Sequence, residues 1–200
     1  MPDEAEGAVA EFVAVMRRLR AECPWKQEQT HRSLVRYLLE ETYETVDAID
    51  EAEASGDFAH LAEELGDLLL QVVFHAVIAE ERGDFDLDAV ARGITEKMRR
   101  RNPHVFGADD TGELTAAQVD ERWQRIKAAE RAAPAELPAA LPALLYADKL
   151  LARRERAGLP LDLDAGSADL GERLLALVAE ARAEGVDPEQ ALRDAARRRR

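Results

Sequence analysis

The sequence predicts an all-α protein, and three observations lead to that class. Apolar residues recur at the helical period along most of the chain, as at Leu34, Leu38 and, two turns later, Val46. We find no stretch with the strict apolar and polar alternation that is typical of a half-buried strand. Of the 200 residues, 46% are hydrophobic and 34% are charged, so the chain can bury a core and is not compositionally disordered.

The first two helices are predicted over residues 8–21 and 30–54. The first must stop before Pro24, because proline disfavours helical backbone at the residue that precedes it. Thr30 is a residue type that often caps a helix, so we place the start of the second helix there. Residues 55–57 then form a turn, whose last residue is an aspartate suited to cap the next helix.

The third predicted helix covers residues 58–82 and ends at Gly83, a residue suited to the left-handed cap position. Its centre is apolar on nearly every face, and such a helix is usually buried all round. One small four-helix domain can scarcely enclose it, so we expect a dimer partner or an additional helical layer. A fourth helix is predicted from Asp86 or Asp88 and ends before Asn102.

The rest of the chain is predicted to hold shorter helices separated by loops. A loop through Gly112 leads to a short helix near residues 116–131. Residues 132–142 contain three prolines and are predicted to be a linker. They separate a first domain, residues 8–131, from a second unit, residues 143–200, in which three helices are expected.

The two parts contain a similar stretch of sequence. LGDLLLQVVFHA begins at Leu65, and LGERLLALVAEA begins at Leu170. In this match Asp67 falls on Glu172, and Glu64 falls on Asp169. True internal repetition and chance similarity between helices rich in alanine and leucine are both compatible with this match.

The formal net charge of −14 is concentrated in one segment. Residues 37–81 contain 13 acidic residues and no Lys or Arg, while the rest of the chain is close to neutral. A nucleic-acid binder needs a concentrated cationic face, so this distribution argues against nucleic acid as a partner. It does not exclude a polyanionic ligand that is held through a divalent metal.

The sequence also indicates in which cellular compartment the protein is expected. The longest strongly apolar run, residues 68–79, is shorter than the roughly 20 residues of a membrane span. The N-terminal segment is acidic and lacks the basic and then apolar order of a signal peptide. A single cysteine, Cys23, excludes an intramolecular disulfide. We expect a cytoplasmic protein that does not associate with membranes.

Two acidic motifs carry the chemistry of the predicted site. Glu40, Glu41 and Glu44 form an EExxE motif on the second helix, and Glu64 and Asp67 form ExxD on the third. Residues three or four apart share one helix face, and two antiparallel helices would bring the pairs opposite each other. Facing carboxylates repel unless they are protonated or bridged, and Mg²⁺ or Mn²⁺ is the natural bridge. The alternative is a solvated acidic face without a metal.

A basic cluster follows at the end of the fourth helix. Lys97 with Arg100 or Arg101 could grip a polyphosphate, because guanidinium groups bind two oxygens at once. The simpler explanation is that cations favour a helix C-terminus. Trp25 and Trp123 could each stack on a base, although tryptophan is more often a core residue.

These residues lie in segments that resemble a known family. CPWKQEQTHRSLVRYLLEETYETVDAI, LAEELGDLLLQVVFHAVIAEERGDFDLDAV, EKMRRRNPHVFG and RWQRIKAAE closely resemble the MazG nucleoside triphosphate pyrophosphohydrolases, over about residues 9–130. The resemblance implies an all-α bundle whose four-helix core is completed by dimerisation. It also implies Mg²⁺-dependent hydrolysis of nucleoside triphosphates to monophosphate and pyrophosphate, often as house-cleaning of non-standard nucleotides.

The resemblance further implies roles for individual residues. Glu40 and Glu41 would be catalytic, with Glu40 a supporting ligand or a water-orienting base. The implied metal ligands are Glu41, Glu44, Glu64 and Asp67. The implied substrate-binding residues are Lys97, Arg100, Arg101, Trp123 and Lys127.

The second unit departs from the family pattern. Residues 143–200 resemble a shortened second copy of the domain, but the EExxE helix is missing. We therefore expect a degenerate unit that cannot complete a metal site. The rival hypothesis for the whole chain is a non-catalytic, metal-stabilised helical protein that serves interaction or regulation.

Overall fold

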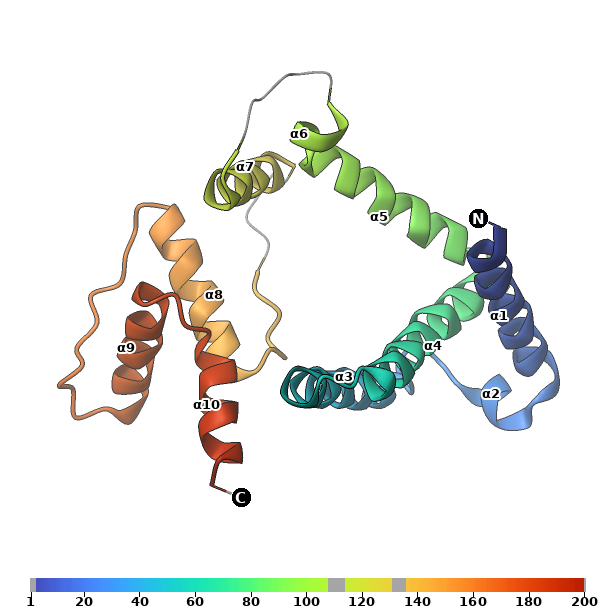
Figure 1. Cartoon of the computed structure of the whole chain (residues 1–200), viewed down its shortest axis with the longest axis horizontal. Helices are drawn as coiled ribbons and strands as arrows, with labels where there is room; N and C mark the ends of the chain where they lie inside the picture. The colour runs from blue at the N-terminus through green and yellow to red at the C-terminus, as the bar shows by residue number, and fades with distance from the viewer. Residues whose placement is uncertain (1–2, 108–113, 131–135, 200) are drawn as a thin grey trace. The chain divides into compact units, whose positions relative to one another are not determined.

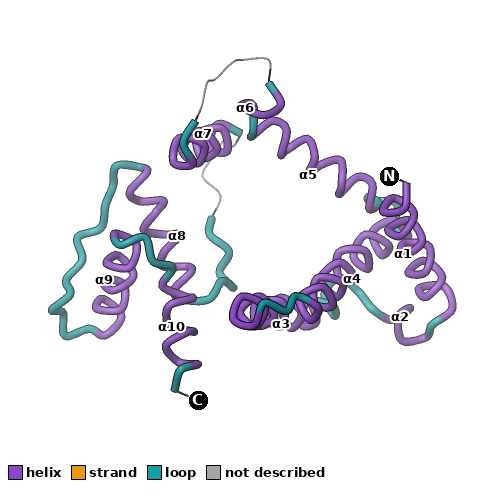
Figure 2. Tube along the Cα trace, in the orientation of Figure 1, coloured by secondary structure: helices purple, strands orange, loops and turns teal. Residues whose placement is uncertain are grey.

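A computed structural model describes residues 3–107, 114–130 and 136–199, and these residues form helices and loops only (Figures 1 and 2). The all-α class is therefore confirmed. The chain divides into two compact units, Met1–Trp123 and Gln124–Arg200. The predicted loop around Gly112 and residues 132–135 of the predicted linker lie outside the described residues.

The first unit contains the long helices. Their bounds are α1 (Asp3–Glu22), α2 (Pro24–Glu28), α3 (Val35–Ser55), α4 (Ala59–Glu81), α5 (Leu87–Arg101) and α6 (Pro103–Phe106). Helix α7 (Ala116–Ala129) crosses the boundary between the units, and α8 (Ala143–Arg156), α9 (Leu170–Ala183) and α10 (Pro188–Arg197) belong to the second. None of the helices in the described ranges combines the length and apolar character needed to cross a membrane.

The start of the second long helix was predicted wrongly. Helix α3 begins at Val35 and not near Thr30. The Thr30 hydroxyl accepts a hydrogen bond from the Ser33 amide at 3.1 Å, and the Thr30 carbonyl accepts one from the Leu34 amide at 3.2 Å. Thr30 thus caps a separate turn over residues 31–34, which precedes α3.

Two short helices were not predicted. In α2 and α6 a proline stands at the first helical turn, where its missing amide hydrogen has no helical partner to lose. The prolines that end the preceding helices therefore also begin new ones. Their four or five residues are below the length that periodicity can detect.

Helices α3 and α4 form a hairpin, and small side chains bring them together. Gly56 ends α3 with φ +77°, and Asp57 accepts a hydrogen bond from the Ala59 amide at 3.0 Å. The buried residues of α3 are Thr45, Ala48 and Ala52, which lie on one face and allow α4 to approach closely. The Thr45 hydroxyl even reaches the backbone carbonyl of Glu64, at 3.4 Å. The two helices are therefore close together at the level of the two acidic motifs.

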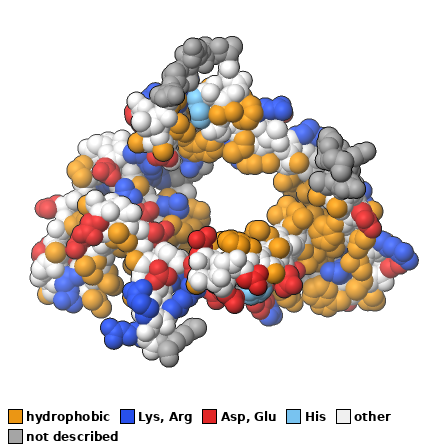
Figure 3. All heavy atoms as spheres, in the orientation of Figure 1, with side chains coloured by type: hydrophobic (Ala, Val, Ile, Leu, Met, Phe, Trp, Pro, Cys, Tyr) orange, Lys and Arg blue, Asp and Glu red, His pale blue; other side chains and the backbone are white. Residues whose placement is uncertain are grey.

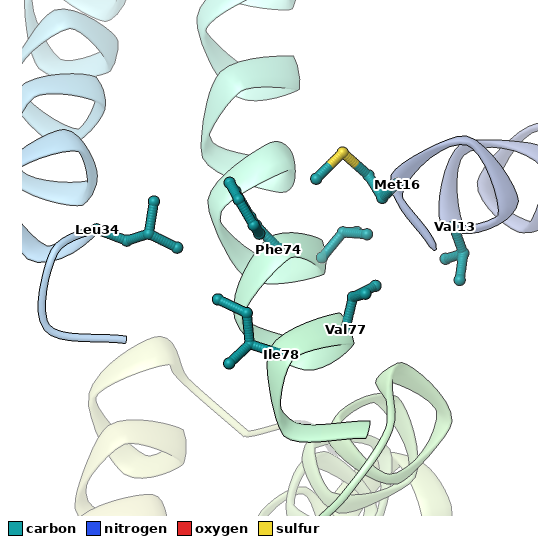
Figure 4. Packing of buried hydrophobic residues seen from close by; sticks show 7 residues of the cluster. Val13, Met16, Leu34, Phe74, Val77 and Ile78 are labelled. Carbon is teal, nitrogen blue, oxygen red and sulfur yellow. The ribbon is translucent and has the colours of Figure 1, made fainter. Parts of the chain in front are cut away.

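The core of the first unit gathers around the C-terminal half of α4. Figure 4 shows Phe74, Val77 and Ile78 of α4 between Leu34 on one side and α1 on the other. Full burial of such side chains contributes about 1.5–3 kcal/mol each. Helix α1 supplies Val13 and Met16, so a contact between distant parts of the sequence anchors the C-terminal half of α4.

One face of α4 is less covered than its sequence predicts. Leu65, Leu69 and Val72 keep 51%, 39% and 43% of their surface exposed in the single chain. The apolar helix was expected to be buried on every face, but within one chain these side chains are partly exposed. The predicted dimer would cover this face, and dimerisation stays a prediction.

The second unit is a small cluster of three helices. Helix α8 contacts both α9 and α10. Arg182 of α9 donates to the carboxylates of Asp148 at 2.6 Å and Glu155 at 3.0 Å on α8. Asp169 and Asp187 cap α9 and α10 by accepting hydrogen bonds from amides of the first turn.

Candidate metal centre

The α3–α4 hairpin brings three carboxylates together. One oxygen from each of Glu41, Glu64 and Asp67 lies within 4.8 Å of the other two. Glu41 comes from α3, and the other two residues are one helical turn apart on α4. Among the described residues this is the one group of His, Cys, Asp or Glu side chains close enough to hold a metal ion. Figure 3 shows acidic side chains gathered over this hairpin with hydrophobic surface beside them.

The other two predicted acids lie at the edge of this group. Glu44 interacts with Glu41 through a hydrogen bond and through charge repulsion. Glu40 is exposed on α3 and lies outside the group of three. The structure therefore brings three of the five motif carboxylates together, with Glu44 in contact with Glu41 and with Glu40 exposed outside the group.

The electrostatics of the group are unfavourable without a cation. Partial burial raises the pKa of Glu41, and repulsion from Asp67, Glu44 and Glu64 raises it further. Each of these causes penalises the charged carboxylate in the folded protein. A divalent cation between the carboxylates would reverse the charge repulsion, so the donor set fits a hard metal with oxygen ligands.

Glu64 adds an independent indication of a ligand. Its side chain is only 13% exposed. Its Oε2 atom is buried and has no hydrogen-bond partner in the described part of the chain, although a buried acceptor normally has one. A metal ion at the carboxylate group would satisfy this oxygen.

Sequence reasoning missed one residue of this site, His60. Its Nε2 lies 3.0 Å from Oε1 of Glu64, and its Nδ1 lies 3.1 Å from Oε2 of Glu51. The hydrogen bonds to Glu51 and Glu64 raise the pKa of His60. The available signal was the spacing, because His60 stands four residues before Glu64 and thus on the same helix face.

The predicted phosphate-binding residues lie elsewhere in the first unit. Figure 1 shows α5 leaving the end of α4 and carrying its basic C-terminal end away from the α3–α4 hairpin. That end holds Lys97, Arg100 and Arg101. The guanidinium of Arg101 lies over the Trp123 ring, 5.3 Å from its centre. Two of the predicted substrate contacts therefore meet each other, whereas the structure does not bring them to the carboxylates.

Two further aromatic and basic residues of the prediction can be placed. Lys127 is half-buried on α7 and lies beyond the boundary of the first unit. Trp25 packs edge-on against Tyr37, with ring centres 5.9 Å apart. That contact is the packing role which is more common for tryptophan.

The second unit uses its corresponding acids differently. Asp169, which matches Glu64, accepts a hydrogen bond from the Glu172 amide at 3.0 Å and caps α9. Glu172, which matches Asp67, lies in the first turn of that helix. Acids at a helix N-terminus are stabilised by the helix dipole, so this pair has a local structural role.

Comparison with known proteins identifies the family to which the region with the two acidic motifs is similar. The sequence profile of the MazG nucleotide pyrophosphohydrolase domain matches residues 29–106, which include both acidic motifs. An uncharacterised 26.1 kDa protein from the blaB 3′ region of Streptomyces cacaoi is 46% identical over 93% of this chain and 77% of its own length.

Two relatives have names that state an activity. The nucleoside triphosphate pyrophosphohydrolase of Escherichia coli K12 is 44% identical over 74% of this chain. The chain spans only 57% of that enzyme's length. The nucleoside triphosphate pyrophosphohydrolase/pyrophosphatase MazG of Thermotoga maritima is 37% identical over 94% of this chain and 81% of its own length. With this coverage and the domain match, the chain belongs to the MazG family of nucleotide pyrophosphohydrolases.

Proposed function

We propose that this protein hydrolyses nucleoside triphosphates to the monophosphate and pyrophosphate, with Mg²⁺ as the cofactor and Mn²⁺ as a possible substitute. The observation that carries the proposal is the carboxylate group of α3 and α4, in which Glu64 has a buried oxygen without a partner. The relatives named as nucleoside triphosphate pyrophosphohydrolases support the reaction.

The carboxylates would bind the metal. Glu41, Glu64 and Asp67 would be ligands, and Glu44 would complete the set from the next turn of α3. A bound Mg²⁺ supplies a water of lowered pKa and offsets the charge of the triphosphate. The protein's part is to hold the carboxylates in place, which the close α3–α4 contact achieves.

Glu40 and Glu41 would serve the attacking water. Glu40 is exposed and stands four residues before Glu44, on the same face of α3, so it would lie at the rim of the site without being a ligand itself. A carboxylate in that position can orient the water and accept its proton. This chemical role would distinguish Glu40 from the acids that bind the metal.

The basic end of α5 would neutralise charge on the phosphates. Lys97, Arg100 and Arg101 offer cationic donors for phosphate oxygens. Trp123 would stack on the base, with Lys127 one turn further along α7. Binding of this kind requires the basic end of α5 and the carboxylates of α3 and α4 to contact the same nucleotide. The two groups could belong to one chain or to the two chains of a dimer.

A homodimer is the proposed working form. Leu38, Leu39 and Tyr43 of α3 are exposed, as are Leu65 and Leu69 of α4. A second copy covering this surface would enclose the apolar helix as the sequence predicts. Sedimentation of the full chain, with a Leu65→Glu variant for comparison, tests this assignment; a monomeric parent protein would contradict it.

House-cleaning of the nucleotide pool is the proposed purpose. The substrates would be standard and non-standard ribo- and deoxyribonucleoside triphosphates in the cytoplasm. The division into a catalytic domain (8–131), a linker (132–142) and a degenerate second unit (143–200) belongs to the same proposal. The capping role of Asp169 supports a second unit without a metal site.

Pyrophosphate release from a panel of nucleoside triphosphates tests the activity. We expect Glu64→Gln to lower the Mg²⁺-dependent rate by at least about 100-fold, since even outer partners of metal ligands change activity by about 10–100-fold. Glu63→Gln is the matched control, because it removes an exposed carboxylate from the adjacent position. Metal binding without hydrolysis of any triphosphate would instead favour the non-catalytic, metal-stabilised interaction protein.

A further inference from the structure

His60 links the two helices that carry the carboxylates. It stands in the first turns of α4, and its two ring nitrogens lie 3.0 Å from Glu64 and 3.1 Å from Glu51 of α3. Since ionised carboxylates only accept hydrogen bonds, the ring donates in both contacts when it is in its protonated, imidazolium form. Both ring nitrogens are thus engaged, and neither is left to bind a metal ion.

The two oxygens of the Glu64 carboxylate have different environments. Oε1 of Glu64 accepts from His60, while Oε2 is buried and lacks a hydrogen-bond partner within the described residues. A carboxylate held at one oxygen cannot rotate freely, so the second oxygen keeps a fixed direction. Metal ligands are commonly oriented in this way by an outer hydrogen-bond partner.

We propose that His60 is a positioning residue for the metal site, which holds Glu64 by Oε1 so that Oε2 is presented to the cation. This inference rests on the proposed function, because it assumes that Glu64 is a ligand. Glu51 fixes the other side of the imidazole and thereby ties the position of Glu64 to α3. The site would thus be aligned by the same hairpin that brings the carboxylates together.

A competing reading is an ordinary surface ion pair. The side chains of His60 and Glu51 are 52% and 67% exposed, and exposed pairs contribute little to stability. An ion pair without a positioning role would leave metal affinity unchanged. Its loss could even strengthen metal binding, because a nearby positive charge would be removed. Metal affinity therefore separates the two readings.

Binding of Mn²⁺ alone to the full chain, measured by titration calorimetry and by the electron paramagnetic resonance of free Mn²⁺, is the direct test. We expect His60→Ala to weaken Mn²⁺ binding by about 10-fold. His60→Gln should stay within about 3-fold of the parent, because its amide nitrogen can still donate to Glu64. Glu51→Gln should fall between the two, and Glu53→Gln, an exposed acid on the same helix, should bind as the parent does.

Kinetics give a second readout. His60→Ala should raise the Mg²⁺ concentration needed for half-maximal rate while keeping most of the rate at saturating metal. Mn²⁺ binding by His60→Ala that is as tight as in the parent, or tighter, would overturn the positioning role. If Glu64→Gln weakens Mn²⁺ binding in the same experiment, Glu64 stands as a metal ligand of the proposed function and only this inference fails. If Glu64→Gln has no effect on Mn²⁺ binding, both fail.

Folding of each variant is checked separately, so that weaker Mn²⁺ binding is not mistaken for the effect of a misfolded protein. Helicity and melting temperature in a chelator should be the same for His60→Ala, His60→Gln and the parent. Should His60→Ala fail to fold, the pair of Glu51→Gln and Glu53→Gln carries the same comparison. Equal Mn²⁺ affinity in that pair would then overturn the role of the His60 bridge.

Discussion

Replacing Glu41 by glutamine is expected to stabilise the metal-free protein and to remove its stabilisation by Mg²⁺. Burial and three neighbouring carboxylates raise the pKa of Glu41 in the folded state. Folding therefore favours the protonated group, and stability is lost as the pH rises through the folded-state pKa. Glutamine keeps the shape of the neutral acid and carries no charge. The same change removes a proposed metal ligand.

The magnitude follows from the geometry of the group. Oxygens of Glu41, Glu64 and Asp67 lie within 4.8 Å of one another. At that separation two unit charges repel by about 0.9 kcal/mol in water and by about 3.5 kcal/mol at an effective dielectric constant of 20. Glu41 is half-exposed, so the lower figure is the better guide. With two neighbours at this distance, we expect Glu41→Gln to gain about 1–3 kcal/mol at pH 7.5 in chelator.

Urea unfolding followed by circular dichroism measures both effects. At Mg²⁺ one hundred times its dissociation constant, the parent protein should gain about 2.7 kcal/mol, because the metal binds the folded state. The variant should gain almost nothing. Near pH 4 in chelator, the two proteins should approach equal stability, since Glu41 is then largely protonated.

Two results would refute this reasoning. A variant that is less stable than the parent in chelator at pH 7.5 would mean that the carboxylate group is not repulsive in the folded state. Equal stabilisation of both proteins by Mg²⁺ would mean that Glu41 does not bind the metal. Glu63→Gln serves as the control for loss of one acidic charge, because Glu63 is exposed on α4.

Three further substitutions, one of them with a surface control, probe the rest of the fold. Phe74→Ala should lower the free energy of unfolding by about 3–5 kcal/mol in urea titrations, because Phe74 is 2% exposed, whereas Val105→Ala on the surface should change it by less than about 0.5 kcal/mol. Burial, and then the neighbouring His31, lower the pKa of His75, so stability present above pH about 6.5 should fall as the pH drops. His75→Phe should flatten this dependence between pH 7.5 and 5.5, and an unchanged slope would contradict the assignment. Asp169→Ala should cost about 1 kcal/mol of stability through loss of the α9 cap, with Mn²⁺ affinity unchanged if the second unit holds no metal.

Local sequence signals located most helix ends correctly. Gly83 follows α4 with φ +74°, and Asp86 caps α5 by accepting from the Ala89 amide at 2.7 Å. These features depend on residues within one or two turns, so the sequence contains them in full. The start of α3 was misplaced because the Thr30 hydroxyl caps a separate turn. The sequence alone does not distinguish such a turn from the first turn of a helix.

The acidic motifs were visible in the sequence for the same local reason. Spacings of three and four residues place Glu41 with Glu44, and Glu64 with Asp67, on single helix faces. That the two faces meet depends on the buried Thr45, Ala48 and Ala52, which let α3 and α4 approach. The carboxylate group could therefore be anticipated once a hairpin was assumed.

What the sequence by itself determined was the helical class, the family and the residue types of the site, because each depends on short-range spacing. Only the tertiary structure decided which groups share an environment. It joined His60 to Glu64 and Glu51, and paired Arg101 with Trp123 across separate helices. It also left one apolar face of α4 uncovered. These outcomes depend on the packing of helices far apart in the chain, and helical periodicity carries no information about that packing.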